Sequence, residues 1–82
     1  MSEGIESITL VKVRAGKIKS VVAKLAEIKG IDEYFTVTGE FDIVIRMRVK
    51  RMEDLQPIID AIDEIDGVED LSTHIIVKKY RG

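Results

Sequence analysis

The chain has 82 residues, of which 13 are basic and 15 are acidic. Its net charge is −2 and residues of both signs are well mixed along the chain, which argues against a domain built to neutralise nucleic-acid phosphates. Because it contains no cysteine and a single histidine, His74, disulfides, thiolate metal sites and histidine-rich metal sites are excluded, and we expect no cofactor. One domain of this size has a marginal core, so oligomerisation is the remaining common means of stabilising it.

The first half of the chain is predicted to form a strand, a helix and a second strand. Met1 to Glu6 has no periodicity and is expected to be a frayed lead-in. Ser7 to Arg14 is predicted to be a central strand, because apolar residues occur on both of its faces. Lys17 to Lys29 is predicted to be a helix that ends at Gly30. Its apolar residues recur on one stripe with a 3.6-residue period, namely Ile18, Val21, Val22, Leu25 and Ile28. Ile31 to Val37 forms the next strand.

Gly39 is expected to make a short turn between two antiparallel strands, because glycine adopts positive φ at little steric cost. Phe41 to Val49 follows as a strand in which every second residue is apolar. Glu40 and Asp42 place two carboxylates at the mouth of the turn. These acids are either solvated groups at a simple hairpin or members of a binding site, and their spacing alone leaves both interpretations open.

The second half of the chain is predicted to form another helix and a last strand. After a loop from Lys50 to Glu53, apolar residues again recur at helical spacing up to about Asp66. A proline deep inside a helix costs ~3 kcal/mol, so Pro57 belongs in the first turn, and Asp54 is a candidate N-cap. Gly67 closes the helix, and Val68 to Lys79 is the last strand.

The element order β-α-β-β-α-β predicts an α+β, ferredoxin-like fold. An internal repeat supports it, since Glu27 to Glu33 resembles Glu64 to Asp70 at an offset of 64 − 27 = 37 residues. Right-handed crossovers give an antiparallel sheet in the order 4-1-3-2 with two helices on one face. The other face has no cover within the chain. There we expect exposed apolar residues and a partner surface, formed by Val11 or Leu10, Val44 and Ile76.

No catalytic constellation is visible, so we do not expect an enzyme. His74 is expected to be a surface residue of an edge strand rather than a catalytic base, because a lone imidazole has no neighbouring group that prepares it for proton transfer. Arg46 and Arg48 are either the solvated side of a strand or interface residues that pair with carboxylates of a neighbouring subunit.

The sequence also bears on location and source. No window approaches ~18 apolar residues, and Met1 to Gly4 shows no cleavable signal, so no membrane partner is expected and the cytoplasm is the default location. There is no asparagine and one glutamine, Gln56, beside many Ile, Val, Lys, Arg and Glu residues. That balance leans towards a heat-adapted source.

Four motifs in this order carry a resemblance to a known family. They are Ile28-x-Gly30-Ile31, Thr38-Gly39-Glu40-Phe41-Asp42, Ile65-x-Gly67-Val68 and Thr73-x-Ile75-Ile76-Val77. Together they resemble the effector-binding domain of the leucine-responsive (Lrp/AsnC) transcription regulators, from about Ser7 to Lys79. Full family members carry an N-terminal winged helix-turn-helix, whereas only Met1 to Glu6 precedes the first strand here. Residues 1–82 therefore look like a single stand-alone sensing (RAM) domain, and no direct binding of nucleic acid is expected.

The resemblance implies an assembly and a ligand. Family members pack their sheets face to face into dimers, and the dimers form rings of eight or ten subunits. Small effectors, usually free amino acids, bind between dimers and regulate transcription, and a full-length regulator of the family is a further implied partner. Carried over to this chain, the ligand-binding residues are Thr38, Gly39, Glu40, Phe41, Asp42 and Thr73.

The chemistry of these residues suits a free amino acid. Backbone N–H groups at the glycine turn can receive the carboxylate, and Asp42 can accept a charge-assisted hydrogen bond from the ammonium. The Thr73 hydroxyl can serve either group. Phe41 is either a site residue or part of the core, since its phase matches Ile43 and Ile45. A small dimeric α/β-barrel enzyme and a purely structural oligomer remain the alternative hypotheses.

Overall fold

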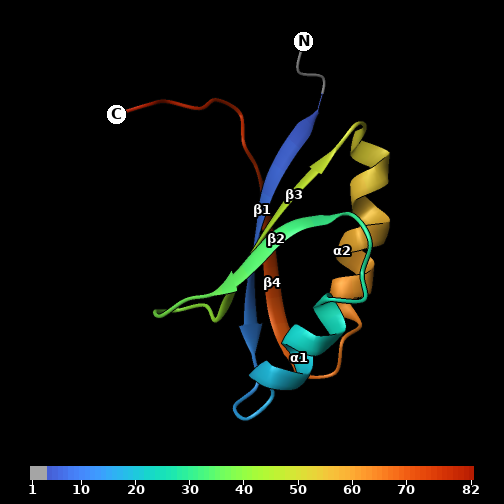
Figure 1. The fold of residues 1–82 in the computed structure, drawn as a ribbon, viewed down its shortest axis with the longest axis vertical. Coiled ribbons are helices and arrows are strands. Elements are labelled where there is room, and N and C mark those ends of the chain that lie inside the picture. The colour runs from blue at the N-terminus through green and yellow to red at the C-terminus, as the bar shows by residue number, and fades with distance from the viewer. Residues whose placement is uncertain (1–3) are drawn as a thin grey trace.

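The computed structural model describes residues 4–82. Its elements are β1 (Ile5–Val13), α1 (Ile18–Leu25), β2 (Ile31–Thr36), β3 (Ile43–Val49), a 3-10 turn η1 (Met52–Asp54), α2 (Leu55–Asp63) and β4 (Val68–Ile75). The strands pair antiparallel in the order β2-β3-β1-β4, and both helices lie on the same side of the sheet (Figure 1). The predicted ferredoxin-like fold and strand order are confirmed. Within residues 4–82, neither helix has the length and apolar character needed to cross a membrane.

The core lies between the helices and one face of the sheet. In β1 the side chains that point to the helices are Ser7, Thr9, Val11 and Val13, and all four are buried. Alternation along a strand sends every second residue to one face, so Ile8 and Leu10 lie on the other side. Residues of β3, α1 and α2 complete the core with Ile43, Ile45, Met47, Val49, Val21, Leu25, Leu55 and Ile62.

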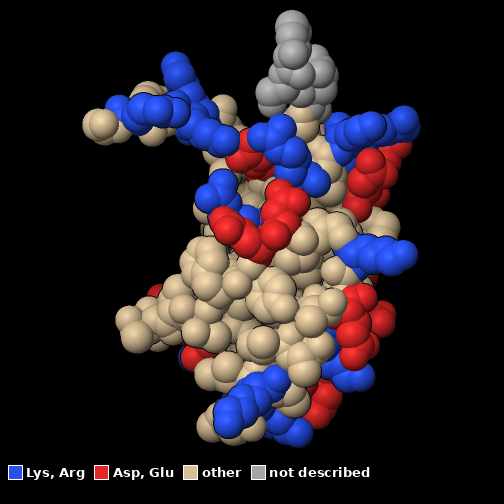
Figure 2. All heavy atoms as spheres, in the orientation of Figure 1, with Lys and Arg blue, Asp and Glu red and all other residues tan. Residues whose placement is uncertain are grey.

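The second face of the sheet, which we call the open face, has no helix over it. Across its middle, Phe35 of β2 lies beside Val44, Val44 lies beside Leu10 of β1, and Leu10 lies opposite Ser72 of β4. Phe35 is 44% exposed, whereas Val11 is 0% exposed. The expected apolar residue on this face is therefore Leu10, and the alternative assignment to Val11 is wrong. Figure 2 shows a broad area without Lys, Arg, Asp or Glu below a group of charged side chains.

The first helix ends earlier than predicted. The α-helical region stops at Leu25, and the following N–H groups of Glu27 and Ile28 donate to carbonyls three residues back, at 3.0 and 3.1 Å. Such i→i+3 bonds tighten the last turn of a helix. The chain therefore keeps turning up to Gly30, which explains why the apolar stripe continues beyond the α-helix.

The second helix begins at Leu55, and Pro57 lies in its first turn, as predicted. Pro57 is the third residue of α2, in its first turn. Asp54 occupies the predicted N-cap position directly before Leu55, but its φ and ψ angles are helical and its side chain makes no capping hydrogen bond. The 3-10 turn η1 precedes α2, and the extended residue that enters the helical region is Arg51, with φ −137° and ψ 150°.

The strand ends also differ from the predicted ones. Ile5 and Glu6 belong to β1 rather than to a frayed lead-in, because they pair with Val49 and Arg48. Residues 1–3 of that predicted lead-in lie outside the described residues. The strand after the turn starts at Ile43 rather than Phe41, and β4 ends at Ile75 rather than Lys79.

The Ser7 side chain lowers the stability of the folded chain. Its hydroxyl is buried and has no hydrogen-bond partner within residues 4–82. A buried polar group without a partner costs about 1–3 kcal/mol. We expect Ser7→Ala to leave the free energy of unfolding unchanged or raise it by up to about 1 kcal/mol, since the lost packing offsets part of the gain. Urea denaturation checks this, and a loss of more than about 1 kcal/mol would mean that the hydroxyl has a partner.

Candidate functional site

The segment from Val37 to Asp42 is an exposed loop at the end of the β2–β3 hairpin. It is closed by a hydrogen bond from the Val37 N–H to the Asp42 carbonyl, at 2.9 Å. Gly39 has a φ of +115°, in the region that favours glycine, and no atom lies within 4 Å of the position that a Cβ would take. The predicted turn at Gly39 is confirmed.

Asp42 is tied to β1 rather than free in solvent. Its N–H donates to the Val11 carbonyl at 2.9 Å, and its Oδ2 accepts the Val13 N–H at 2.8 Å. The register of β1 against β4 shifts between Lys12 and Val13, so the carboxylate binds an N–H group at an irregular point of the sheet. In the described chain no hydrogen bond or ion pair reaches Oδ1. One oxygen of Asp42 therefore holds the loop in place and the other remains available.

The tip of the loop offers backbone donors. Thr38, Gly39 and Glu40 are exposed, and among the described residues their N–H groups make no hydrogen bond. The Glu40 carbonyl accepts the Lys12 ammonium at 3.4 Å. Phe41 is half-buried and lies outside the core cluster, so its assignment to the core is wrong. It leaves the core because the loop extends to Asp42 and β3 starts only at Ile43.

Thr73 lies apart from the loop. It is in β4 directly opposite Thr9 of β1, and the two hydroxyl oxygens are 2.9 Å apart. Because β1 separates β4 from β3, the β2–β3 loop and Thr73 belong to different parts of the sheet. Within one chain, the residues predicted to bind the ligand thus form two groups, the loop residues 38–42 and the isolated Thr73.

The sequence interpretation missed Ser7 and Thr9, which lie on the helix-covered face. Both have the same period-two phase as Val11 and Val13, but β1 carries apolar residues in both phases, so periodicity gave no signal that this face is the buried one. His74 is an exposed residue of the edge strand β4, as predicted. Its Nε2 lies 2.8 Å from the Ser72 hydroxyl.

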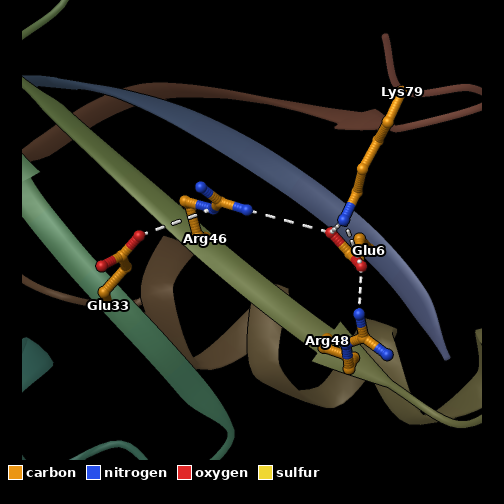
Figure 3. Close-up of polar contacts among 5 residues, drawn as sticks. All are labelled: Glu6, Glu33, Arg46, Arg48 and Lys79. Carbon is orange, nitrogen blue, oxygen red and sulfur yellow. Dashed lines mark hydrogen bonds and ion pairs between the residues drawn. The ribbon is translucent and has the colours of Figure 1, made fainter. Parts of the chain in front are cut away.

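Charged side chains converge on Glu6 at one end of the open face (Figure 3). Lys79 lies 2.7 Å from its carboxylate, Arg48 is in direct contact with it, and Arg46 is 3.8 Å away. Arg46 also lies 3.6 Å from Glu33 of β2. The hydrogen bond from Lys79, and then the charge of Arg48, lower the pKa of Glu6. Arg46 and Arg48 therefore pair within their own chain, and the expectation that they pair with a neighbouring subunit is not needed to explain them.

A cavity of about 400 Å³ lies between α1 and α2. Its lining contains none of the residues predicted to bind a ligand, and it consists of Lys17, Ser20, Lys24, Ala61, Glu64, Ile65 and Asp66. Lys17 lies 3.2 Å from Asp66, and the hydrogen bond between them lowers the pKa of that carboxyl. Charge pairing between the residue that precedes α1 and the segment that follows α2 is a sufficient explanation for this surface.

The fold defines a ferredoxin-like α+β domain with an exposed glycine loop and an uncovered sheet face. Residues 6–81 match the family of Lrp/AsnC ligand binding domains, and the chain belongs to that family. The HTH-type transcriptional regulator FL11 of Pyrococcus horikoshii is 40% identical over 72 residues, which are 88% of this chain and 48% of that protein. The chain thus spans about half the length of the curated relatives it matches.

Two further proteins, an enzyme and a protein of known structure, are similar to this chain. A homocitrate synthase of Sulfurisphaera tokodaii is 30% identical over 78 residues, which are 94% of this chain and 17% of that enzyme. Protein TTHA0845 of Thermus thermophilus has a TM-score of 0.85 at 26% identity, over 95% of this chain and 99% of that one.

One solved neighbour holds an amino acid. A transcriptional regulator of Neisseria meningitidis, NMB0573, was solved as a complex with L-Met and has a TM-score of 0.84, over 98% of this chain and 54% of that one. At 19% identity, this likeness shows a shared fold.

Proposed function

We propose that this chain is a non-enzymatic sensing module that binds a small effector, a free amino acid, and modulates transcription regulators as part of an oligomer. Membership of the Lrp/AsnC ligand-binding family supports the sensing role. The observation that carries the ligand class is the loop 38–42, where unoccupied N–H groups lie close in sequence to a carboxylate with one free oxygen.

This loop matches the two charged groups of an amino acid. Backbone N–H groups of Thr38, Gly39 and Glu40 suit a carboxylate, because an exposed run of such groups forms an anion-binding concavity. Oδ1 of Asp42 suits the ammonium, and hydrogen bonds to charged groups are about twice as strong as neutral ones. Since Oδ2 is already held by the Val13 N–H, the carboxylate is oriented before the ligand arrives.

The separation of Thr73 from the loop favours a site shared between subunits. Both groups are at the periphery of the sheet, the loop beyond the β2–β3 hairpin and Thr73 on edge strand β4. A second subunit that brings its β4 edge to the loop would complete the site. This arrangement agrees with dimers that pack through the open face and assemble into a ring of eight or ten subunits, with the effector between dimers.

The regulator relatives supply the proposed partner. The matched regulators are about twice as long as this chain, and their names describe them as HTH-type transcriptional regulators. We propose that the chain acts on such a full-length regulator in the cytoplasm and does not itself contact DNA.

An enzymatic role has less support. The match to homocitrate synthase covers 17% of that enzyme, so it gives no reason to transfer the catalytic activity. Within residues 4–82 the only imidazole, His74, is exposed and contacts Ser72.

Calorimetric titration with the twenty standard amino acids, L-methionine included, tests the proposal. For the amino acid that binds most tightly, we expect Asp42→Asn to weaken binding by about 1.5–3 kcal/mol, roughly ten- to hundredfold, because a charge-assisted hydrogen bond is lost. The fold should survive, since the asparagine amide oxygen can still accept the Val13 N–H. Thr73→Val should also weaken binding, while its β-branched shape suits the strand.

Asp32→Asn is the matched control, because Asp32 is an exposed carboxylate in β2 outside the loop. It removes the same charge and should leave the affinity unchanged. Equal affinity in wild type and Asp42→Asn would reduce the loop to a simple hairpin connection. Absence of binding by all twenty amino acids would refute the proposed ligand class.

A further inference from the structure

Thr9 is a buried hydroxyl with one partner. Its side chain is 0% exposed, and its Oγ1 lies 2.9 Å from Oγ1 of Thr73, which is half-buried. Within the described residues the structure shows no other hydrogen bond to the Thr9 hydroxyl. Two threonines at directly opposite positions in neighbouring antiparallel strands stabilise each other, but this pair also connects the core with the accessible edge of β4.

The environment decides which hydroxyl donates. Each threonine has one proton, and only one of the two protons can lie between the two oxygens. If Thr73 donated, the Thr9 proton would be left without an acceptor in the core, which costs more than an unused lone pair. Thr9 therefore donates to Thr73, and the proton of Thr73 is left free to point towards the β4 edge.

We propose that Thr9 is a positioning residue of the effector site, which directs the Thr73 hydroxyl to donate its proton to the carboxylate of the bound amino acid. This inference rests on the proposed function and deepens it, because it assigns Thr73 to the carboxylate rather than to the ammonium. The donated bond from Thr9 also strengthens the outgoing bond from Thr73, since hydrogen bonds in a chain polarise one another.

The neighbouring Ser7 provides a matched control for this role. It is another buried hydroxyl on the same face of β1, two residues from Thr9, but its hydroxyl has no partner within residues 4–82. Removing the Ser7 hydroxyl deletes a buried polar group from the same strand without touching Thr73. An effect on affinity that follows from general disturbance of β1 would appear in both variants, whereas a positioning effect would appear only at Thr9.

The experiment measures affinity for the amino acid that the wild-type chain binds most tightly among the twenty, and affinity for its primary amide, which lacks the carboxylate. We expect Thr9→Val to weaken binding of the amino acid by about two- to tenfold, the range of one ordinary hydrogen bond. Thr9→Ser, which keeps the hydroxyl, should restore the affinity, and Ser7→Ala should not change it. Thermal unfolding of each variant reports stability separately.

Two readouts separate positioning from a merely structural role. In the Thr73→Val background, Thr9→Val should cause no further loss of affinity, because its effect passes through Thr73. The amide should lose less affinity than the amino acid on Thr9→Val, since its carbonyl oxygen is an uncharged and therefore weaker acceptor for the Thr73 hydroxyl.

Other results overturn the inference. Additive losses in the double variant, or an unchanged affinity in Thr9→Val, would show that Thr9 does not act through Thr73 while leaving the proposed amino-acid site intact. Absence of binding to wild type by all twenty amino acids would instead refute the proposed function, and the role of Thr9 with it.

Discussion

Sedimentation equilibrium should show the wild-type chain as an oligomer at micromolar concentration and Leu10→Asp as a much smaller species. Leu10 lies in central strand β1 on the open face, between Val44 and Ser72. In a face-to-face dimer, an aspartate there is buried without a partner, which costs several kcal/mol. We expect the dimer to weaken by at least about a thousandfold, which corresponds to about 4 kcal/mol.

Ala23→Asp is the control for this effect. Ala23 is an exposed residue of α1, on the opposite side of the molecule from the open face. The variant carries the same added charge, so it should keep the wild-type oligomeric state. A wild-type chain that sediments as a 9.2 kDa monomer would show that the open face is not an interface between copies of this chain.

Gly67→Ala should lower the free energy of unfolding by about 2–5 kcal/mol. Gly67 has a φ of +104°, and left-handed backbone costs roughly 1–2 kcal/mol for a residue with a Cβ. The new Cβ would also lie 2.8 Å from Cβ of Lys17 and 3.1 Å from Cγ2 of Val21, and overpacking adds about 1–3 kcal/mol. The Gly67 carbonyl accepts the Arg14 N–H at 2.7 Å, so the backbone cannot move away without losing that bond.

Gly16→Ala separates the two contributions to this loss. Gly16 also has positive φ, +84°, but no atom lies within 4 Å of the position of its Cβ. It should therefore lose only the conformational part, about 1–2 kcal/mol. Urea denaturation at one fixed protein concentration gives both values, since association changes apparent stability. Equal losses in the two variants would mean that the contact between Gly67 and α1 relaxes freely.

The candidate site illustrates what local sequence patterns can reveal. The loop at Gly39 was predicted from one glycine between two apolar segments, and the structure places it at the β2–β3 connection. The attachment of Asp42 to Val13 was not predicted, because the two residues are 29 positions apart and meet only where the register of β1 shifts. The pairing of Thr73 with Thr9 spans 64 positions and depends on the strand order in the same way.

Four features could be predicted from local patterns: the order of the elements, the strand order, the turn at Gly39 and the place of Pro57. Each depends on periodicity, on backbone restriction or on the handedness of crossovers. The packing of the helices against the sheet was needed to show that Leu10 rather than Val11 lies on the open face. The pattern of β1 is apolar on both sides, so it carries no signal for the face that the helices cover. The tertiary structure also decided that Glu6 holds Arg46, Arg48 and Lys79, since side chains from separate segments meet only after the sheet has formed.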